Sequence, residues 1–182
     1  IDAAKLWEGA VMAPEEYGRQ VAVLSPVDML LHNAVHLFMN DELRGGLRDV
    51  VDFRDLFEHF AEGETRFEQH LLQRAEALGC GRPLYYAAMT AQRLAGLDLS
   101  SDFNSAVQAH APAYPAARLM NWLIEQALAP QRLGMWQTAV ANQLLFIRSH
   151  WVRMPPGMLI LHLWHKTFKS KKPSTHDAEM PG

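Results

Sequence analysis

SPVDMLLHNAVHLFMNDELRGGLRDVVDFRDLF, residues 25–57, is the stretch that decides how this chain folds. Ser25 can cap a helix, Pro26 suits the first helical position, and Asp28 places a carboxylate in the first turn, where the helix dipole favours it. Ser-x-x-Asp before an apolar run also resembles a capping box, with Asp in place of Glu. A helix over residues 25–40 is therefore predicted, with a buried face formed by the apolar residues that recur at helical spacing: Leu30, Leu31, Ala34, Val35, Phe38 and Met39.

Glycine, proline and serine divide the rest of the chain into further helices. Gly79 is expected to end one helix, Pro83 to begin the next, and Ser101 to cap another. Strand-like alternation is nearly absent, and RQVAVL at 19–24 is either a short strand or an extended loop. The sequence therefore predicts an all-α bundle of about seven to nine helices, over residues 3–11, 25–40, 47–60, 64–78, 83–94, 101–110, 116–128, 131–151 and 158–169.

Length and composition fit one small globular domain. The 182 residues are 49% hydrophobic, which is ample for a core. The net charge of −3 gives no strong nucleic-acid signal, and the single cysteine, Cys80, excludes an internal disulfide. No apolar run approaches the ~20 residues that span a bilayer. We expect a cytoplasmic protein with a helical domain over 1–170 and a polar, disordered tail over 171–182.

Two histidines one helical turn apart raise the question of a metal site. His32 and His36 share a helix face, and Asp49 or Asp52 of the following helix could complete a ligand set. The alternative is structural, because buried polar groups generally find partners. On that interpretation a buried hydrogen bond between His36 and Asp52 pins the two helices together.

The C-terminal segment is apolar and then basic. Residues 158–164 are rich in leucine, and four of the five lysines follow closely. Such an amphipathic helix either lies on an anionic membrane surface, peripheral to the inner membrane, or docks on its own bundle with its lysines in water. The candidate surface residues are Trp164, Lys166, Lys169, Lys171 and Lys172. The tryptophans Trp136, Trp151 and Trp164 are expected in the core, as are Leu6 and Trp7 of the first helix.

The stretch 25–57 also resembles a known family. A leucine-rich helix that opens with Ser-Pro-x-Asp, a His near its end, a short loop and an Arg-x-x-x-Asp helix are similar to the helical part of uncharacterised bacterial nucleotidyltransferases, within the DNA polymerase beta-like superfamily. The residues that carry the resemblance are Ser25, Pro26, Asp28, Leu30, Leu31, His36, Leu47, Arg48 and Asp52. RSHWVRMPPGMLILHLWHK, residues 148–166, resembles the closing segment of the branch found beside exopolysaccharide and protein-sorting gene clusters.

The resemblance implies metal-assisted transfer of a nucleotidyl group from a nucleoside triphosphate. Family members carry a Gly-Ser or Gly-Gly turn followed by a strand with two carboxylates one residue apart, and these bind Mg²⁺. This sequence has no such Asp-x-Asp strand, and its only Gly-Gly, Gly45-Gly46, precedes a predicted helix. Residues 1–11 are similar to the family helix that follows the catalytic sheet. The chain is therefore expected to be the helical portion of a longer protein, without catalytic residues or a cofactor of its own.

Arg44 and Arg48 are the candidate phosphate contacts that the resemblance implies. In the family architecture a helical domain faces the nucleotide cleft, where arginine can bind phosphate by two parallel hydrogen bonds. The alternative is a solvated helix face on which Asp49, Asp52 and Asp55 pair locally with these arginines and with Arg54.

Two functions stay open from the sequence. The chain is either a substrate-side or accessory domain of a nucleotidyltransferase, inactive alone, whose ligands are a nucleoside triphosphate and an unknown acceptor, or a non-catalytic module that contacts a protein partner or a membrane surface.

Overall fold

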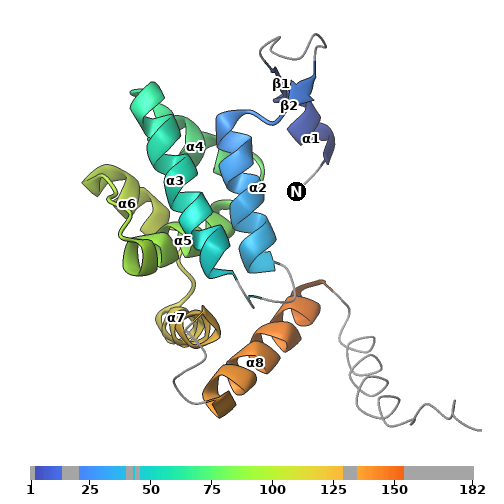
Figure 1. The fold of residues 1–182 in the computed structure, drawn as a ribbon, viewed down its shortest axis with the longest axis vertical. Helices are drawn as coiled ribbons and strands as arrows, with labels where there is room; N and C mark the ends of the chain where they lie inside the picture. The colour runs from blue at the N-terminus through green and yellow to red at the C-terminus, as the bar shows by residue number, and fades with distance from the viewer. Residues whose placement is uncertain (1–2, 14–20, 40–42, 44–45, 129–134, 154–182) are drawn as a thin grey trace, which may run out of the picture.

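The computed structural model describes residues 3–13, 21–39, 43, 46–128 and 135–153. Within them the predicted all-α class is confirmed, with a single pair of two-residue strands (Figure 1). Helices α2 to α6 pack into one body, α1 and the strands lie at the N-terminal end of α2, and α7 packs on α8 at the opposite end. The elements are α1 (Ala3–Glu8), β1 (Val11–Met12), β2 (Ala22–Val23), α2 (Pro26–Met39), α3 (Leu47–Gly63), α4 (Phe67–Ala77), α5 (Gly81–Thr90), the π-helix η1 (Ala91–Ala95), α6 (Ser101–Gln108), α7 (Tyr114–Leu128) and α8 (Met135–Arg153).

The N-terminal segment departs from its prediction. The first helix ends at Glu8 instead of residue 11, because Val11 and Met12 form a strand that pairs antiparallel with β2. The short strand within residues 19–24 is thereby confirmed. Trp7 was expected inward, yet it is 69% exposed. The six-residue α1 lies at the edge of the described helices, beside the two strands (Figure 1).

Aromatic residues from three helices join the centre of the bundle. The ring of Phe57 from α3 lies 5.8 Å from that of Phe67 in α4 and 5.4 Å from that of Phe103 in α6, both edge-on. All three side chains are buried. Edge-to-face contacts of this kind add to the stabilisation that comes from buried apolar area. The predicted apolar face of α2 packs against the same core through buried residues that include Leu30, Leu31, Ala34 and Phe38.

Gly79 ends α4 as predicted, whereas the cap of α6 lies one residue before the predicted Ser101. Gly79 has a φ of 65°, and the N–H groups of Gly79 and Cys80 donate to the carbonyls of Glu76 and Ala75, which forms a Schellman motif. The cap of α6 is Ser100, whose Oγ accepts a hydrogen bond from the Phe103 N–H. Ser100 takes this place because Glu68 of α4 accepts hydrogen bonds from both its N–H and its hydroxyl.

One arginine connects α8 to the bundle. Arg148 donates from Nη1 to the carbonyl of Phe38, 3.2 Å away, in the last turn of α2. Its guanidinium carbon also lies 5.6 Å from the centroid of the Tyr86 ring. A cation at a helix C-terminus satisfies an unpaired carbonyl, and its position over an aromatic face adds a second attraction. The predicted helix over 158–169 and the tail over 171–182 lie outside the described residues.

Candidate functional site

The predicted cap of α2 forms, with a different use of its carboxylate. The Asp28 N–H donates to Ser25 Oγ at 3.3 Å, as an N-cap requires. In a capping box the acidic side chain accepts from the backbone of the capping residue. Here Asp28 Oδ2 instead accepts from the Ser25 hydroxyl, 2.9 Å away. The carboxylate oxygens of Asp28 can therefore accept further hydrogen bonds from a residue of another helix.

Asp28 forms a buried, bidentate ion pair with Arg74 of α4. Nε of Arg74 lies 2.7 Å from Oδ1 and Nη2 lies 3.0 Å from Oδ2. The Asp28 side chain is fully buried, whereas that of Arg74 is 25% exposed. The hydrogen bond to Asp28 raises the pKa of Arg74, so the guanidinium stays charged. A carboxylate at this depth depends on its partner, because an uncompensated buried charge costs several kcal/mol.

The N-terminal segment closes over this pair. Nη2 of Arg74 also donates to the carbonyl of Lys5 at 2.7 Å. Gly9 lies so close that an added Cβ would be 2.6 Å from both Arg74 Nη2 and Asp28 Oδ2. Glycine is therefore required at this position by close approach. We call Ser25, Asp28 and Arg74 the Asp28 cluster. It holds the segment that includes Lys5 and Gly9 against α2 and α4.

His32 and His36 do not form the buried link that was predicted. Both imidazoles are exposed, with ring centroids 6.2 Å apart, on the side of α2 turned from the core. The prediction of a buried hydrogen bond between His36 and Asp52 is wrong, because the leucine face of α2 packs on the core and its histidine face is exposed to solvent. Asp52 is itself half exposed and pairs with Arg48.

The structure also keeps the two carboxylates from joining the histidines. No group of three or more His, Cys, Asp or Glu side chains suited to a metal occurs within the described ranges. Asp49 is half-buried in the first turn of α3, while Asp52 projects into solvent. A ligand set that combines His32 and His36 with either carboxylate is therefore not assembled. Metal binding by the two imidazoles alone stays a prediction.

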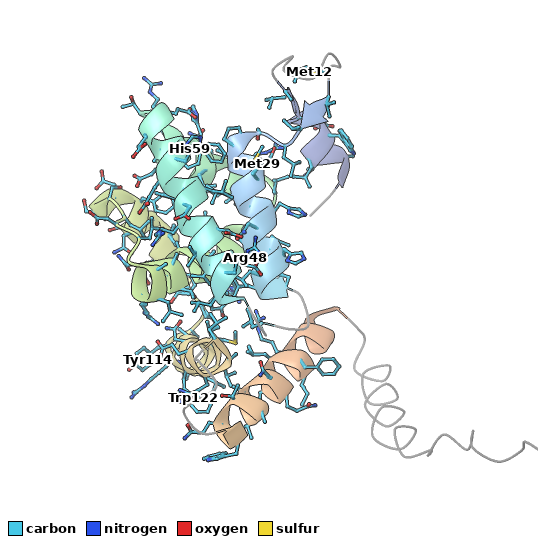
Figure 2. All side chains as sticks on the ribbon, viewed as in Figure 1. Met12, Met29, Arg48, His59, Tyr114 and Trp122 are labelled. Carbon is cyan, nitrogen blue, oxygen red and sulfur yellow. The ribbon has the colours of Figure 1, made fainter. Side chains whose placement is uncertain are left out.

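The arginines of α3 pair locally, as one of the two interpretations predicts. Arg48 Nε lies 3.8 Å from Asp52 Oδ2, and the Arg48 side chain is 87% exposed at the base of α3 (Figure 2). Arg54 pairs with Asp55 at 2.6 Å and also donates to the carbonyl of Ala95 at 3.0 Å, which ties α3 to the end of η1. Arg44 lies outside the described residues.

The C-terminal candidates lie outside the described residues, and the prediction that Trp136 is in the core is wrong. Trp164 and the lysines Lys166, Lys169, Lys171 and Lys172 fall outside the described residues. Trp136, expected in the core, is 68% exposed near the start of α8. Val140 and Leu144 on the same face are also exposed, so the described helices do not cover α8 from Trp136 to Leu144 on this side. None of the described helices has the length and apolar character to cross a membrane.

Cys80 is placed as an inert residue. It is 3% exposed, and its Sγ lies 3.5 Å from the carbonyl of Leu78. Burial raises the pKa of the thiol, which disfavours the reactive thiolate. The structure therefore gives no reason to treat Cys80 as a nucleophile.

Comparison with known proteins bears on the segment that holds these residues. The family described as uncharacterised nucleotidyltransferase matches residues 1–96. This chain belongs to that family. The matched residues run from α1 to the end of η1 and include the Asp28 cluster, the two histidines and Arg48. Neither the curated proteins nor the solved structures contain a match to the chain.

The Asp28–Arg74 pair is the part of this nucleotidyltransferase-family segment that sequence reasoning missed. The sequence gives Asp28 a place in the helix cap and in the family resemblance, and nothing in it distinguishes Arg74 from the other arginines. The two lie 46 residues apart on different helices, so no local spacing connects them. The one available signal was an acidic residue at the start of a helix with an otherwise apolar inner face.

Proposed function

We propose that this chain supplies the helical, substrate-side domain of a metal-dependent nucleotidyltransferase and is inactive by itself. The observation that carries the proposal is the family match over residues 1–96. The sequence adds support, because it holds no Gly-Ser turn followed by an Asp-x-Asp strand. Mg²⁺, held by carboxylates outside this sequence, would bridge the nucleotide phosphates and neutralise charge during transfer.

Arg48 is the described residue best suited to meet a phosphate. Its side chain is 87% exposed, and the one ion pair that it forms among the described residues, at 3.8 Å to Asp52, is long. Exposed pairs of this length contribute little, so a phosphate oxygen can compete for the same donors. His32 and His36 are exposed on α2 and can contact a ligand or another domain without breaking any packing.

The Asp28 cluster has a supporting role in this proposal. It holds the Lys5 carbonyl and Gly9 against α2 and α4, so the segment that precedes α2 has a fixed position on the bundle. A domain joined through this segment would be oriented by it. Residues that act in this way position the reacting groups and are not catalytic themselves.

The test compares this chain with the protein expressed from the native start codon of its gene. Binding of ATP, CTP, GTP and UTP is measured by isothermal titration with and without Mg²⁺, and pyrophosphate release is followed in parallel. We expect this chain to show neither Mg²⁺-dependent binding nor turnover, and the longer product to show both. Binding or turnover by this chain would refute its inactivity, and an inactive longer product would refute the transferase assignment.

Two arginine variants of the longer product test the phosphate contact. Arg48→Ala should raise the KM for the nucleotide by about tenfold, the value of one hydrogen bond to a charged group. The control is Arg118→Ala, an exposed arginine on α7 outside the matched segment, which should leave KM unchanged. Equal effects of the two substitutions would remove Arg48 from the site.

A further inference from the structure

His32 and His36 place two imidazoles on one exposed face of α2. Residues four apart on a helix are neighbours on its surface. Both side chains are exposed, their ring centroids lie 6.2 Å apart, and the planes of the rings are inclined by 27°. Two histidines at this spacing on a helix supply two of the zinc ligands in metalloproteases. The pair on α2 therefore has the spacing of a two-ligand chelate.

The helix beneath the two rings has a fixed position in the bundle. Leu31 and Ala34 of the same helix are fully buried, and α2 packs against α3, α4 and α5. Its first turn is capped by Ser25, and its last turn receives a hydrogen bond from Arg148. An ion that binds the two rings would therefore restrict side chains only, because the backbone is already ordered. Preorganisation of this kind raises affinity.

Both rings have nitrogen atoms that can accept a ligand bond. Among the described residues, neither His32 nor His36 forms a hydrogen bond or an ion pair, and each has its ring contact with the other. His70 of α4 differs in this respect, because its Nδ1 is paired with the carboxylate of Glu64. A neutral imidazole has one nitrogen that acts as an acceptor. The two histidines of α2 can thus bind an ion without breaking an interaction with the described chain.

The chemistry of the two ligands decides the class of ion. Imidazole suits zinc, copper and nickel, whereas Mg²⁺ takes oxygen ligands. Metal–nitrogen bonds of about 2.0–2.1 Å let one ion between the rings reach both of them after a small rotation of the exposed side chains. Within the described ranges no carboxylate completes a group of three ligands. Water or another small ligand from solution would therefore fill the remaining coordination positions.

We propose that His32 and His36 form a binding site for one borderline divalent transition-metal ion of the class of Zn²⁺, Ni²⁺ and Cu²⁺. Affinity should be highest for Cu²⁺, in the general order for nitrogen ligands. The ion joins residues one helical turn apart, so it binds the folded chain better than the unfolded chain and stabilises it. This inference goes beyond the proposed transferase function and does not depend on it, because the site uses nitrogen ligands and discriminates against Mg²⁺.

Isothermal titration of the full chain with NiCl₂, without nucleotide, tests the proposal. The substitutions His32→Asn and His36→Asn should each weaken binding at this site by at least about tenfold, since even changes around metal ligands commonly cost that much in affinity. The double variant should bind little more weakly than either single variant, because one imidazole alone does not chelate. A large excess of MgCl₂ should leave the affinity for Ni²⁺ unchanged.

Paramagnetic Cu²⁺ locates the ion and separates this site from binding elsewhere in the chain. In nitrogen-15 spectra of the unmodified chain, low concentrations of Cu²⁺ should broaden the amide signals of residues 32–36 before those of α3 to α7. The same signals should stay sharp in the variant His32→Asn/His36→Asn. This readout depends on position, so histidines outside α2 cannot produce it.

The matched control is His59→Asn/His70→Asn. These two histidines are also exposed, but they lie on α3 and α4, and His70 already has a partner in Glu64. The control variant should keep both the Ni²⁺ affinity and the Cu²⁺ broadening of α2. All of the substituted side chains are exposed, so we expect every variant to keep its helix content, which circular dichroism checks.

Five outcomes would overturn the proposal. The first two are an unchanged Ni²⁺ affinity in both single variants and a loss in only one of them. The third is an equal loss in the control variant, and the fourth is Cu²⁺ broadening that spares α2. The fifth is displacement of Ni²⁺ by Mg²⁺, which would assign the ion to oxygen ligands. None of these readouts uses nucleotide or turnover, so failure of this site and failure of the transferase proposal are distinguishable.

Discussion

Replacing Arg74 by methionine should be among the most damaging single substitutions in this protein. Methionine keeps most of the aliphatic stem but removes the guanidinium that donates twice to Asp28, at 2.7 and 3.0 Å, and once to the Lys5 carbonyl. Asp28 is fully buried, so its carboxylate would keep only the Ser25 hydroxyl. Leaving a buried charge without its partner costs about 3–5 kcal/mol. A small domain has a total stability of about 5–15 kcal/mol, so this is a large part of it.

Replacing the other partner of the ion pair should lower the free energy of unfolding by a smaller amount. Asp28→Asn removes the buried charge and leaves Arg74, whose side chain is 25% exposed and can recover water. We expect about 1.5–3 kcal/mol, the value of hydrogen bonds to a charged group. In the double variant Asp28→Asn/Arg74→Met the cost should be well below the sum of the two single costs, because the second change no longer strands a charge.

Urea unfolding followed by far-ultraviolet circular dichroism measures all three variants. The control is Arg93→Met, because the Arg93–Glu125 pair at 3.4 Å is nearly half exposed and should be worth less than about 1 kcal/mol. Hydrogen exchange adds a local readout, since Arg74→Met should speed exchange of the Gly9 amide, which donates to the Leu6 carbonyl. A cost for Arg74→Met no larger than that of the control, or strictly additive single costs, would refute the role given to this pair.

Three further predictions concern other positions. Gly9→Ala should destabilise by about 1–3 kcal/mol, because its Cβ would lie 2.6 Å from two charged atoms; Gly63→Ala, which has nothing within 4 Å, should be neutral or stabilising in the same urea experiment. Arg148→Ala should speed hydrogen exchange in α8 and lower the free energy of unfolding by about 1–2 kcal/mol. The control Arg48→Ala should lower it by less than about 0.5 kcal/mol, and equal costs would contradict the prediction. Burial raises the pKa of Cys80 above its ordinary 9.0, so its contribution to stability is present below that pH and is lost as the pH rises beyond it. Urea unfolding at mildly alkaline pH should show this decline, Cys80→Ala should remove part of it, and an unchanged slope in that variant would be the contrary result.

The features that the sequence predicted well are those with local causes. Ser25 caps α2 and Gly79 ends α4 because each acts on backbone groups within a few residues. The buried faces of α2 and α3 follow in the same way from helical periodicity, which places Leu30 and Phe53 on the inner side of their helices. The sequence was therefore sufficient for the fold class and for most helix boundaries.

The features that were missed depend on which helices become neighbours. His36 and Asp52 have the chemistry of a hydrogen-bonded pair, but the rotation of each helix about its axis is set by leucine and phenylalanine packing. Arg74 reaches Asp28 only because α4 crosses beside the start of α2. Trp136 was assigned to the core from its residue type alone, although a tryptophan at an interaction surface has the same composition signal.

The aromatic contact between α3, α4 and α6 affects how the protein can be divided. The family match stops at residue 96, before α6 begins. A fragment cut at that point would lose Phe103, which packs on the Phe57 ring. It would also lose Ser100, which binds Glu68 through its N–H and its hydroxyl. The unit of folding therefore extends at least through α6, and expression fragments or domain swaps should place their junction after residue 108 instead of at the end of the matched segment.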